Sequence, residues 1–220
     1  VTHLGHMGCY AAVPALDLAT RLAEPGEPRP VSTLHVELCT LHLRPETLEP
    51  DQVVIQHLFS DGAIRYDVVK DAPAKPLFAY LGSFEAILPD TSEEMTWRLS
   101  SSGFVMTLAR EVPNVVAKAL PGLVSKFLQE HDLYPSDVAC YAIHPGGTKI
   151  IDGVAACLEA PAKATRLSRE VFASRGNMSS ATLPHIWERV TNDPSLNDGA
   201  HILSLAFGPG LTVTGNLLRK

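Results

Sequence analysis

The 220-residue sequence lacks several features that mark common protein classes. It has no run of 18 apolar residues and no signal-peptide hydrophobic region, so neither a membrane span nor secretion is predicted. No run of Lys or Arg forms a basic stripe, and with a net charge of −6 and a pI near 5.8 a nucleic-acid partner is not expected. The four cysteines form no CxxC pair, which favours reduced thiols in a cytoplasmic protein over a disulfide framework.

What the sequence contains is sufficient for a large core. Apolar residues make up 45% and charged residues 19% of the chain, which predicts one large folded domain or a tight pair of small ones. Apolar periodicity and turn residues predict both helices and strands. In chain order they predict a turn and helix in 1–27, a strand in 31–43, a helix and strand in 45–71, a strand in 78–89, a long helix from near 112 to 133, a strand, Gly-rich turn and helix in 135–160, a turn and helix in 168–193, and two strands about a Gly-Pro-Gly turn in 200–220.

The segment DAPAKP at 71–76 indicates a boundary, so we expect one unit in residues 1–71 and a second in 72–220. A weak internal repeat supports two related units: laying Cys9 on His144 also lays Asp17 on Asp152. Chance similarity between strand–helix units is an equal alternative. If the repeat holds, the second copy has more elements before its His turn than the first has before its Cys turn, which predicts that the front of the first copy is missing.

Cys9 is the first candidate for chemistry. It lies in GHMGCYAA, where a turn should lead into a helix, and the positive end of a helix favours the thiolate form that attacks thioesters. Taken alone, Cys9 fits better the common alternative of a small buried apolar residue.

Two further segments carry polar side chains at predicted element ends. His144 follows the apolar run VACYAI and precedes Gly-Gly, which places an imidazole at the edge of a sheet with room for a ligand. Asn177 lies in SRGNMSSAT, where an amide can donate a hydrogen bond to a developing oxyanion. Taken alone, His144 could be an ordinary histidine in a turn, and Asn177 could be an ordinary helix N-cap.

Together, these segments resemble the type III polyketide synthases, the chalcone and stilbene synthase family of the thiolase-like fold. The similar segments, in order, are GCYAAVPALDLA, FSDGA, GFVMTLAREVPNVVAKAL, IHPGGTKIIDGV, RGNMSSAT and FGPGLTV. Two neighbouring families fit less well. Ketoacyl synthase III enzymes typically have His-Gln-Ala-Asn where this chain has His-Pro-Gly-Gly at residues 144–147. Classical thiolases have a second His in place of the residue that corresponds to Asn177.

The resemblance implies a fold and an activity. The fold would be the layered αβαβα arrangement of two related halves with mixed five-stranded-type sheets, the first half being incomplete. The activity would be decarboxylative condensation of malonyl-CoA onto an acyl starter carried by Cys9, with His144 and Asn177 as the other catalytic residues, followed by cyclisation or release. The resemblance also implies CoA thioesters as substrates without a further cofactor or metal, a homodimer, and a need for the missing N-terminal segment. A ketoacyl synthase III-like enzyme and a non-catalytic subunit are the alternatives.

The resemblance also assigns residues to the substrate pocket. Phe59 would be the gatekeeper phenylalanine between the CoA tunnel and the cavity, with a core aromatic as the alternative. Met106, Trp97 and His42 fall at or near positions where plant members carry a second gatekeeper phenylalanine, a small glycine and a threonine. Ser179 would line the cavity. The residues expected near CoA are Gly146, Gly147 and Lys149, although an ordinary solvated lysine is the alternative for the last.

Overall fold

The computed structural model describes residues 1–71, 75–100 and 103–220. The helices are α1 (Ala12–Leu22), α2 (Pro50–Leu58), α3 (Val112–Gln129), α4 (Thr148–Cys157), α5 (Arg166–Arg175) and α6 (Thr182–Thr191). The strands are β1 (Val31–Glu37), β2 (Gly62–Val68), β3 (Ala79–Ile87), β4 (Met95–Ser100), β5 (Gly103–Leu108), β6 (Val138–Ile143), β7 (His201–Gly208) and β8 (Thr212–Arg219). Short 3-10 turns include η1 (Gly8–Tyr10), η2 (Cys39–His42) and η5 (Ser179–Ala181).

The main sheet has the order β3-β8-β7-β6. Strands β6 and β7 run parallel, and the other two pairings are antiparallel. Nearly every residue of β6, β7 and β8 is buried, because helices cover both faces of the sheet and the strands are correspondingly apolar. The parallel pairing brings the carboxyl ends of β6 and β7 to one edge, and this edge holds the site described below.

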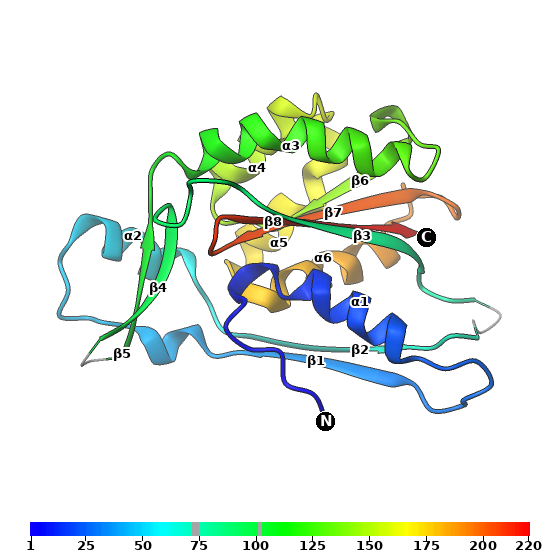
Figure 1. Cartoon of the computed structure of the whole chain (residues 1–220), viewed down its shortest axis with the longest axis horizontal. Helices are drawn as coiled ribbons and strands as arrows, with labels where there is room; N and C mark the ends of the chain where they lie inside the picture. Colours follow the sequence, from blue (N-terminus) through cyan, green and yellow to red (C-terminus); the bar gives the residue numbers. More distant parts are fainter. Residues whose placement is uncertain (72–74, 101–102) are drawn as a thin grey trace.

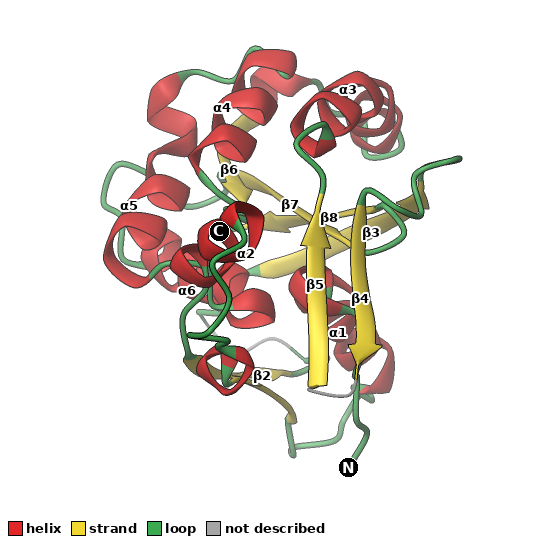
Figure 2. Cartoon of the chain, turned by 90° about the vertical axis from the view of Figure 1, so that its left-hand side faces the viewer, coloured by secondary structure: helices red, strands yellow, loops and turns green. Residues whose placement is uncertain are grey.

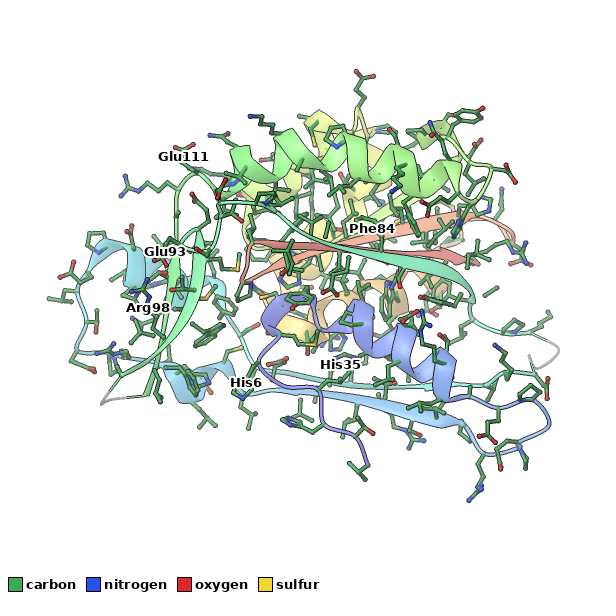
Figure 3. All side chains as sticks on the ribbon, viewed as in Figure 1. His6, His35, Phe84, Glu93, Arg98 and Glu111 are labelled. Carbon is green, nitrogen blue, oxygen red and sulfur yellow. The ribbon has the colours of Figure 1, made fainter. Side chains whose placement is uncertain are left out.

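The molecule is layered (Figure 1). Helices α3 and α4 lie over one face of the main sheet, and α1 with α6 lies under the other. Beyond α1 lies a second, two-stranded antiparallel sheet of β1 and β2. Figure 3 shows Phe84 of β3 near α3, where its ring lies 4.9 Å from that of Phe127. The layers agree with the expected α/β architecture, and the main sheet has four strands in the described residues where a five-stranded type was expected.

Most of the predicted elements are present, but two strands and one helix were missed. The hairpin of β4 and β5, which stands upright in Figure 2, lies between the strand predicted in 78–89 and the long helix predicted from near 112, where no element was expected. Residues 166–175 form α5, where only a turn was expected. The predicted boundary at 71–76 includes residues 72–74, which lie outside the described residues. Within the described ranges, no helix has the length and apolar character needed to cross a membrane.

Candidate active site

The turn that carries Cys9 is held tightly against the main sheet. Cys9 lies in η1, which leads into α1 as predicted, and it is 8% exposed. A Cβ added to Gly208 at the end of β7 would lie 2.1 Å from the ring of Tyr10. Because real Cβ contacts are never that short, only glycine lets η1 pack so closely on β7.

Burial opposes the thiolate form that the helix end was expected to favour at Cys9. Burial raises the pKa of the Cys9 thiol to about 12, and the negative charge of Glu37 acts in the same direction. Hydrogen bonds from the side chains of Ser179 and Asn177 lower the pKa but do not offset burial. Burial is therefore the largest of these influences on the Cys9 thiol.

Asn177 lies directly beside this thiol. Its Nδ2 is 3.9 Å and its Oδ1 4.0 Å from Sγ of Cys9. The backbone N–H of Ser179 donates to Oδ1 at 2.9 Å, so the Nδ2–H group is left to face the sulfur. The backbone of Asn177 is fixed by a parallel bridge to Phe59, and Gly176 before it adopts φ +71° to turn the chain out of α5.

His144 lies at the end of β6 and is 2% exposed. Neither ring nitrogen has a hydrogen-bond partner among the described residues, although its backbone N–H donates to Leu205 of β7 at 2.8 Å. Burial lowers the pKa of His144 to about 3, so the imidazole is neutral. Because η1 also packs on β7, His144 and Cys9 share one edge of the main sheet, but no hydrogen bond joins them in the part of the chain that the structure describes.

The five predicted pocket residues come together around a cavity of about 120 Å³. They are Phe59, Met106, Trp97, His42 and Ser179. A larger cavity of about 950 Å³ adjoins it, and His42, Trp97 and Ser179 line both. The ring of Trp97 lies 5.5 Å from that of His42 and 6.0 Å from that of Phe104, so these aromatic rings stand between the two spaces.

The three residues expected near CoA lie elsewhere. Gly147 begins α4 with φ +136°, Gly146 is half-buried and Lys149 is exposed. None of the three lines either cavity. Among the described residues no group of three or more His, Cys, Asp or Glu side chains is arranged to hold a metal ion.

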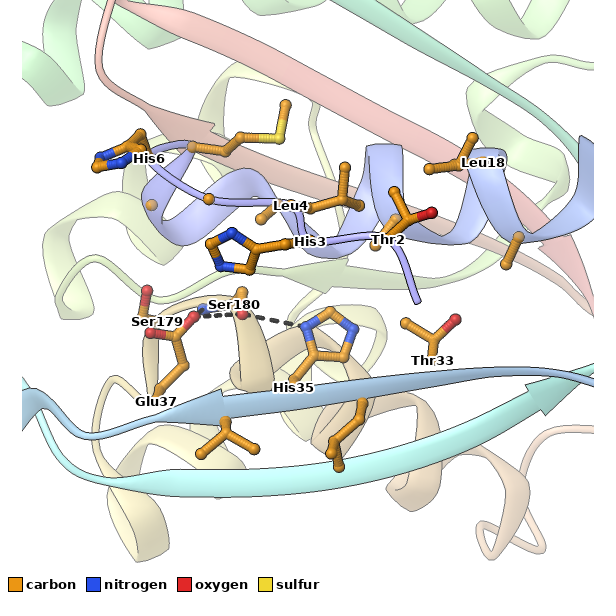
Figure 4. A pocket seen from close by; sticks show the side chains of 18 of the residues that line it. Thr2, His3, Leu4, His6, Leu18, Thr33, His35, Glu37, Ser179 and Ser180 are labelled. Carbon is orange, nitrogen blue, oxygen red and sulfur yellow. Dashed lines mark hydrogen bonds between the residues drawn. The ribbon is translucent and has the colours of Figure 1, made fainter. Parts of the chain in front are cut away.

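A polar chain on the wall of the larger cavity was not predicted (Figure 4). His35 is 5% exposed, and its Nδ1 lies 3.0 Å from Oγ of Ser180, which also hydrogen-bonds Glu37. On the other side, Nε2 of His35 lies 3.4 Å from the hydroxyl of Tyr66. The only signal in the sequence was a His and a Glu two residues apart in a predicted strand, which puts both on one face.

Comparison with known proteins identifies the class and then the family. The layered arrangement with its cysteine turn is the thiolase-like fold. The C-terminal type III polyketide synthase domain of Steely1, a type I/III hybrid from Dictyostelium, superposes with a TM-score of 0.90 at 29% identity. The 1,3,6,8-tetrahydroxynaphthalene synthase of Streptomyces coelicolor A3(2), a bacterial type III polyketide synthase, superposes with a TM-score of 0.89 at 25% identity. These alignments cover 100% and 98% of this chain and 61% of each solved chain.

The chain belongs to the chalcone and stilbene synthase family, because the model of the C-terminal domain of these enzymes matches residues 81–220. The 1,3,6,8-tetrahydroxynaphthalene synthase of Streptomyces peucetius subsp. caesius is 33% identical over 195 residues, which cover 84% of this chain and 50% of that protein. The chain therefore spans about half the length of this curated relative, and the recognised resemblance and fold class are confirmed.

Proposed function

We propose that these residues form the catalytic part of a type III polyketide synthase that condenses malonyl-CoA with an acyl starter. The observation that carries the proposal is the buried pairing of the Asn177 amide with the Cys9 thiol, 3.9 Å apart, at the sheet edge that also holds His144. A thiol, an oriented amide N–H and a neutral imidazole are the groups that acyl transfer and enolate formation require.

In the first step Cys9 accepts the starter. The neutral imidazole of His144 takes the thiol proton as Sγ attacks the thioester carbonyl. The new Sγ–carbon bond forms, the bond to the CoA sulfur breaks, and the proton passes from His144 to the leaving thiolate. Burial raises the pKa of Cys9, so its thiol needs a base during the attack, and burial lowers the pKa of His144, so its imidazole is free to accept a proton.

In the second step malonyl-CoA loses carbon dioxide. The N–H groups of His144 and Asn177 donate to the thioester oxygen on which the enolate charge develops, and burial strengthens both interactions. The enolate carbon attacks the acyl group on Cys9, a carbon–carbon bond forms and Sγ leaves. The extended chain then returns to Cys9, or cyclises and is released.

The remaining assignments belong to the same proposal. Phe59, which is bridged to Asn177 and lines the smaller cavity, would act as the gatekeeper, and Trp97 with His42 would limit the space for the growing chain. Gly146, Gly147 and Lys149 meet the CoA moiety outside the cavities. The enzyme acts as a homodimer, uses no cofactor beyond its CoA substrates, and requires the part of the family fold that lies outside this chain.

The test is incubation of the full-length protein with malonyl-CoA and a panel of acyl-CoA starters, with mass spectrometry of the products. We expect a malonyl-dependent polyketide that disappears in Cys9→Ala and persists in Cys157→Ala, whose thiol lies at the end of α4. Full product formation by Cys9→Ala would refute the proposal.

A further inference from the structure

The orientation of the Asn177 amide depends on the turn that follows it. The backbone N–H of Ser179, in η5, donates to Oδ1 of Asn177 at 2.9 Å. This bond decides which end of the amide is engaged by the turn, and it leaves the Nδ2–H group for the side where Sγ of Cys9 lies, 3.9 Å away. If Ser179 shifts, the amide loses the contact that prevents it from rotating.

The turn η5 does not hold itself in place. Ser179 has φ +49°, in the left-handed region that residues with a Cβ atom disfavour. Within the turn, the N–H of Ala181 donates to the carbonyl of Met178 at 3.1 Å, and the N–H of Met178 donates to Oγ1 of Thr182 at 2.9 Å. A disfavoured conformation persists only where its surroundings also hold it, so contacts from outside the turn matter.

The contacts from outside the turn come from β1 and meet at Ser180 (Figure 4). The backbone N–H of Ser180 donates to Oε1 of Glu37 at 3.2 Å, and the Ser180 hydroxyl donates to the same oxygen. Nδ1 of His35 lies 3.0 Å from Oγ of Ser180. Because the single hydroxyl hydrogen goes to the carboxylate, His35 supplies the hydrogen of this bond. Glu37 and His35 are two residues apart in one strand and therefore face Ser180 from the same side.

The strand face behind Ser180 is itself packed. His35 is 5% exposed, and its ring stacks on that of Tyr66 at a centroid distance of 5.6 Å. Nε2 of His35 lies 3.4 Å from the Tyr66 hydroxyl, and the Tyr66 ring meets that of Trp187 in α6 edge-on at 5.7 Å. The hydrogen bonds to Ser180 therefore start from a layer whose side chains are enclosed.

We propose that Glu37 and His35 are positioning residues for the decarboxylation step. By fixing Ser180 they hold η5, and through the N–H of Ser179 they orient the Asn177 amide toward the place where the enolate oxygen develops. The inference rests on the proposed function, in which Asn177 donates to that oxygen. A donor stabilises a developing charge only while its orientation is kept, so a loosened η5 slows decarboxylation.

Two half-reactions separate this role from general loosening of the fold. Transfer of the starter uses Cys9 and His144, whereas decarboxylation also uses Asn177. In the second reaction the bond from malonyl-CoA to its carboxylate breaks, carbon dioxide leaves, and without a starter the enolate carbon takes a proton to give acetyl-CoA. A positioning role for Asn177 alone predicts a loss in the second half-reaction and a nearly unchanged first one.

The experiment measures both half-reactions with the full-length protein. Acetyl-CoA is measured after incubation with malonyl-CoA alone, and acyl-enzyme after incubation with a starter acyl-CoA alone. Ser180→Ala removes both hydroxyl contacts and keeps the backbone contact with Glu37. We expect it to slow decarboxylation about 5- to 50-fold, below the roughly 100-fold that a misplacement of about 1 Å can cost. Ser32→Ala removes an exposed hydroxyl of the same strand, which contacts Asp67, and should behave as the wild type.

Conservative and combined variants test the route through Asn177. Glu37→Gln keeps an acceptor oxygen and His35→Asn keeps an N–H donor, so both should retain most of the decarboxylation that Glu37→Ala and His35→Leu lose. In Asn177→Ala, adding Ser180→Ala should have no further effect, because the group through which Ser180 acts is gone. If Glu37→Ala or His35→Leu does not fold, Ser180→Ala alone and combined with Asn177→Ala still decides.

Equal losses in both half-reactions would mean general loosening and would overturn the proposal. So would a Ser180→Ala effect that persists in Asn177→Ala, or equal losses in Glu37→Gln and Glu37→Ala, which would make the carboxylate charge the active element. Amide hydrogen exchange of Ser179 needs no turnover, and it should become several-fold faster in Ser180→Ala; unchanged exchange contradicts the proposal. A wild type inactive in both half-reactions refutes the proposed function, while the exchange measurement still tests the hold on η5.

Discussion

His35 and His144 are both buried, and burial lowers the pKa of both, yet their surroundings differ. His144 lies on the main sheet with neither ring nitrogen hydrogen-bonded among the described residues, whereas both nitrogens of His35, on the second sheet, have partners. A buried polar group without a partner costs stability, and such a cost is common at reactive sites. The difference teaches that burial alone does not separate the two histidines, whereas unused hydrogen-bonding capacity distinguishes His144, the residue proposed to react.

Replacing each histidine should give the largest contrast. We expect His144→Leu to lower malonyl-dependent product formation by about 10²- to 10⁴-fold, because leucine can neither take the thiol proton nor donate to the enolate oxygen. His35→Asn should leave the rate nearly unchanged, since the asparagine amide can still donate to Ser180. Steady-state kinetics of both variants, with near-ultraviolet circular dichroism as a check on folding, decides the matter. Equal losses would remove the distinction between the two histidines.

The close packing of η1 on β7 can be tested by adding a single methyl group at Gly208. Gly208→Ala should destabilise the protein by about 1–3 kcal/mol, because the new methyl group overlaps the Tyr10 ring and displaces the cysteine turn. Gly122→Ala in α3 is the matched control: its added Cβ meets no atom within 4 Å, and alanine favours a helix interior by roughly 0.5–1 kcal/mol. Urea denaturation gives both values, and a neutral Gly208→Ala would contradict the packing described here.

Both histidines should make stability fall in acid. In the unfolded chain each imidazole has its ordinary pKa of 6.5, while the folded values are about 4 for His35 and about 3 for His144. Between pH 6.5 and 4 the unfolded state therefore binds more protons. The free energy of unfolding should fall with decreasing pH by up to about 1.4 kcal/mol per pH unit for each histidine. Denaturation of wild type and His35→Asn at several pH values in this range should show a shallower slope in the variant; identical slopes would contradict a buried neutral His35.

The smallest effect concerns product choice rather than rate. Trp97→Ala removes a ring from the wall between the two cavities, so we expect a shift of a few-fold toward products with more extensions. Leu99→Ala changes the same strand at an exposed position that lines neither cavity and should leave the product pattern unchanged. Chromatography with mass spectrometry of the products compares the two variants, and an unchanged pattern in Trp97→Ala would exclude this residue from length control.

The sequence predicted the main sheet and the contact at its edge better than it predicted the second sheet. Strands β6 to β8 are continuous apolar runs, and the family-like segments around Cys9 and Asn177 correctly indicated that these distant residues meet. It did not reveal that burial raises the pKa of Cys9, because burial depends on the packing of η1 against β7 and η5.

The part that could not be predicted is concentrated in β1. Its alternation would ordinarily bury Leu34 and Val36, yet these are 65% and 55% exposed, and the polar face with His35 points inward. Period-two patterns indicate a strand but do not fix which face is covered when the polar residues satisfy one another. The hydrogen bonds from His35 to Ser180 and Tyr66 join residues far apart in sequence, so no local sequence pattern could have predicted them.

The most direct test of the central claim is capture of the acyl-enzyme. The full-length protein is incubated with a starter acyl-CoA in the absence of malonyl-CoA, quenched, and measured by intact-protein and peptide mass spectrometry. The account predicts one added acyl group, located on Cys9 and absent from Cys9→Ala. An acyl group found on another residue, or undiminished acylation in Cys9→Ala, would contradict it.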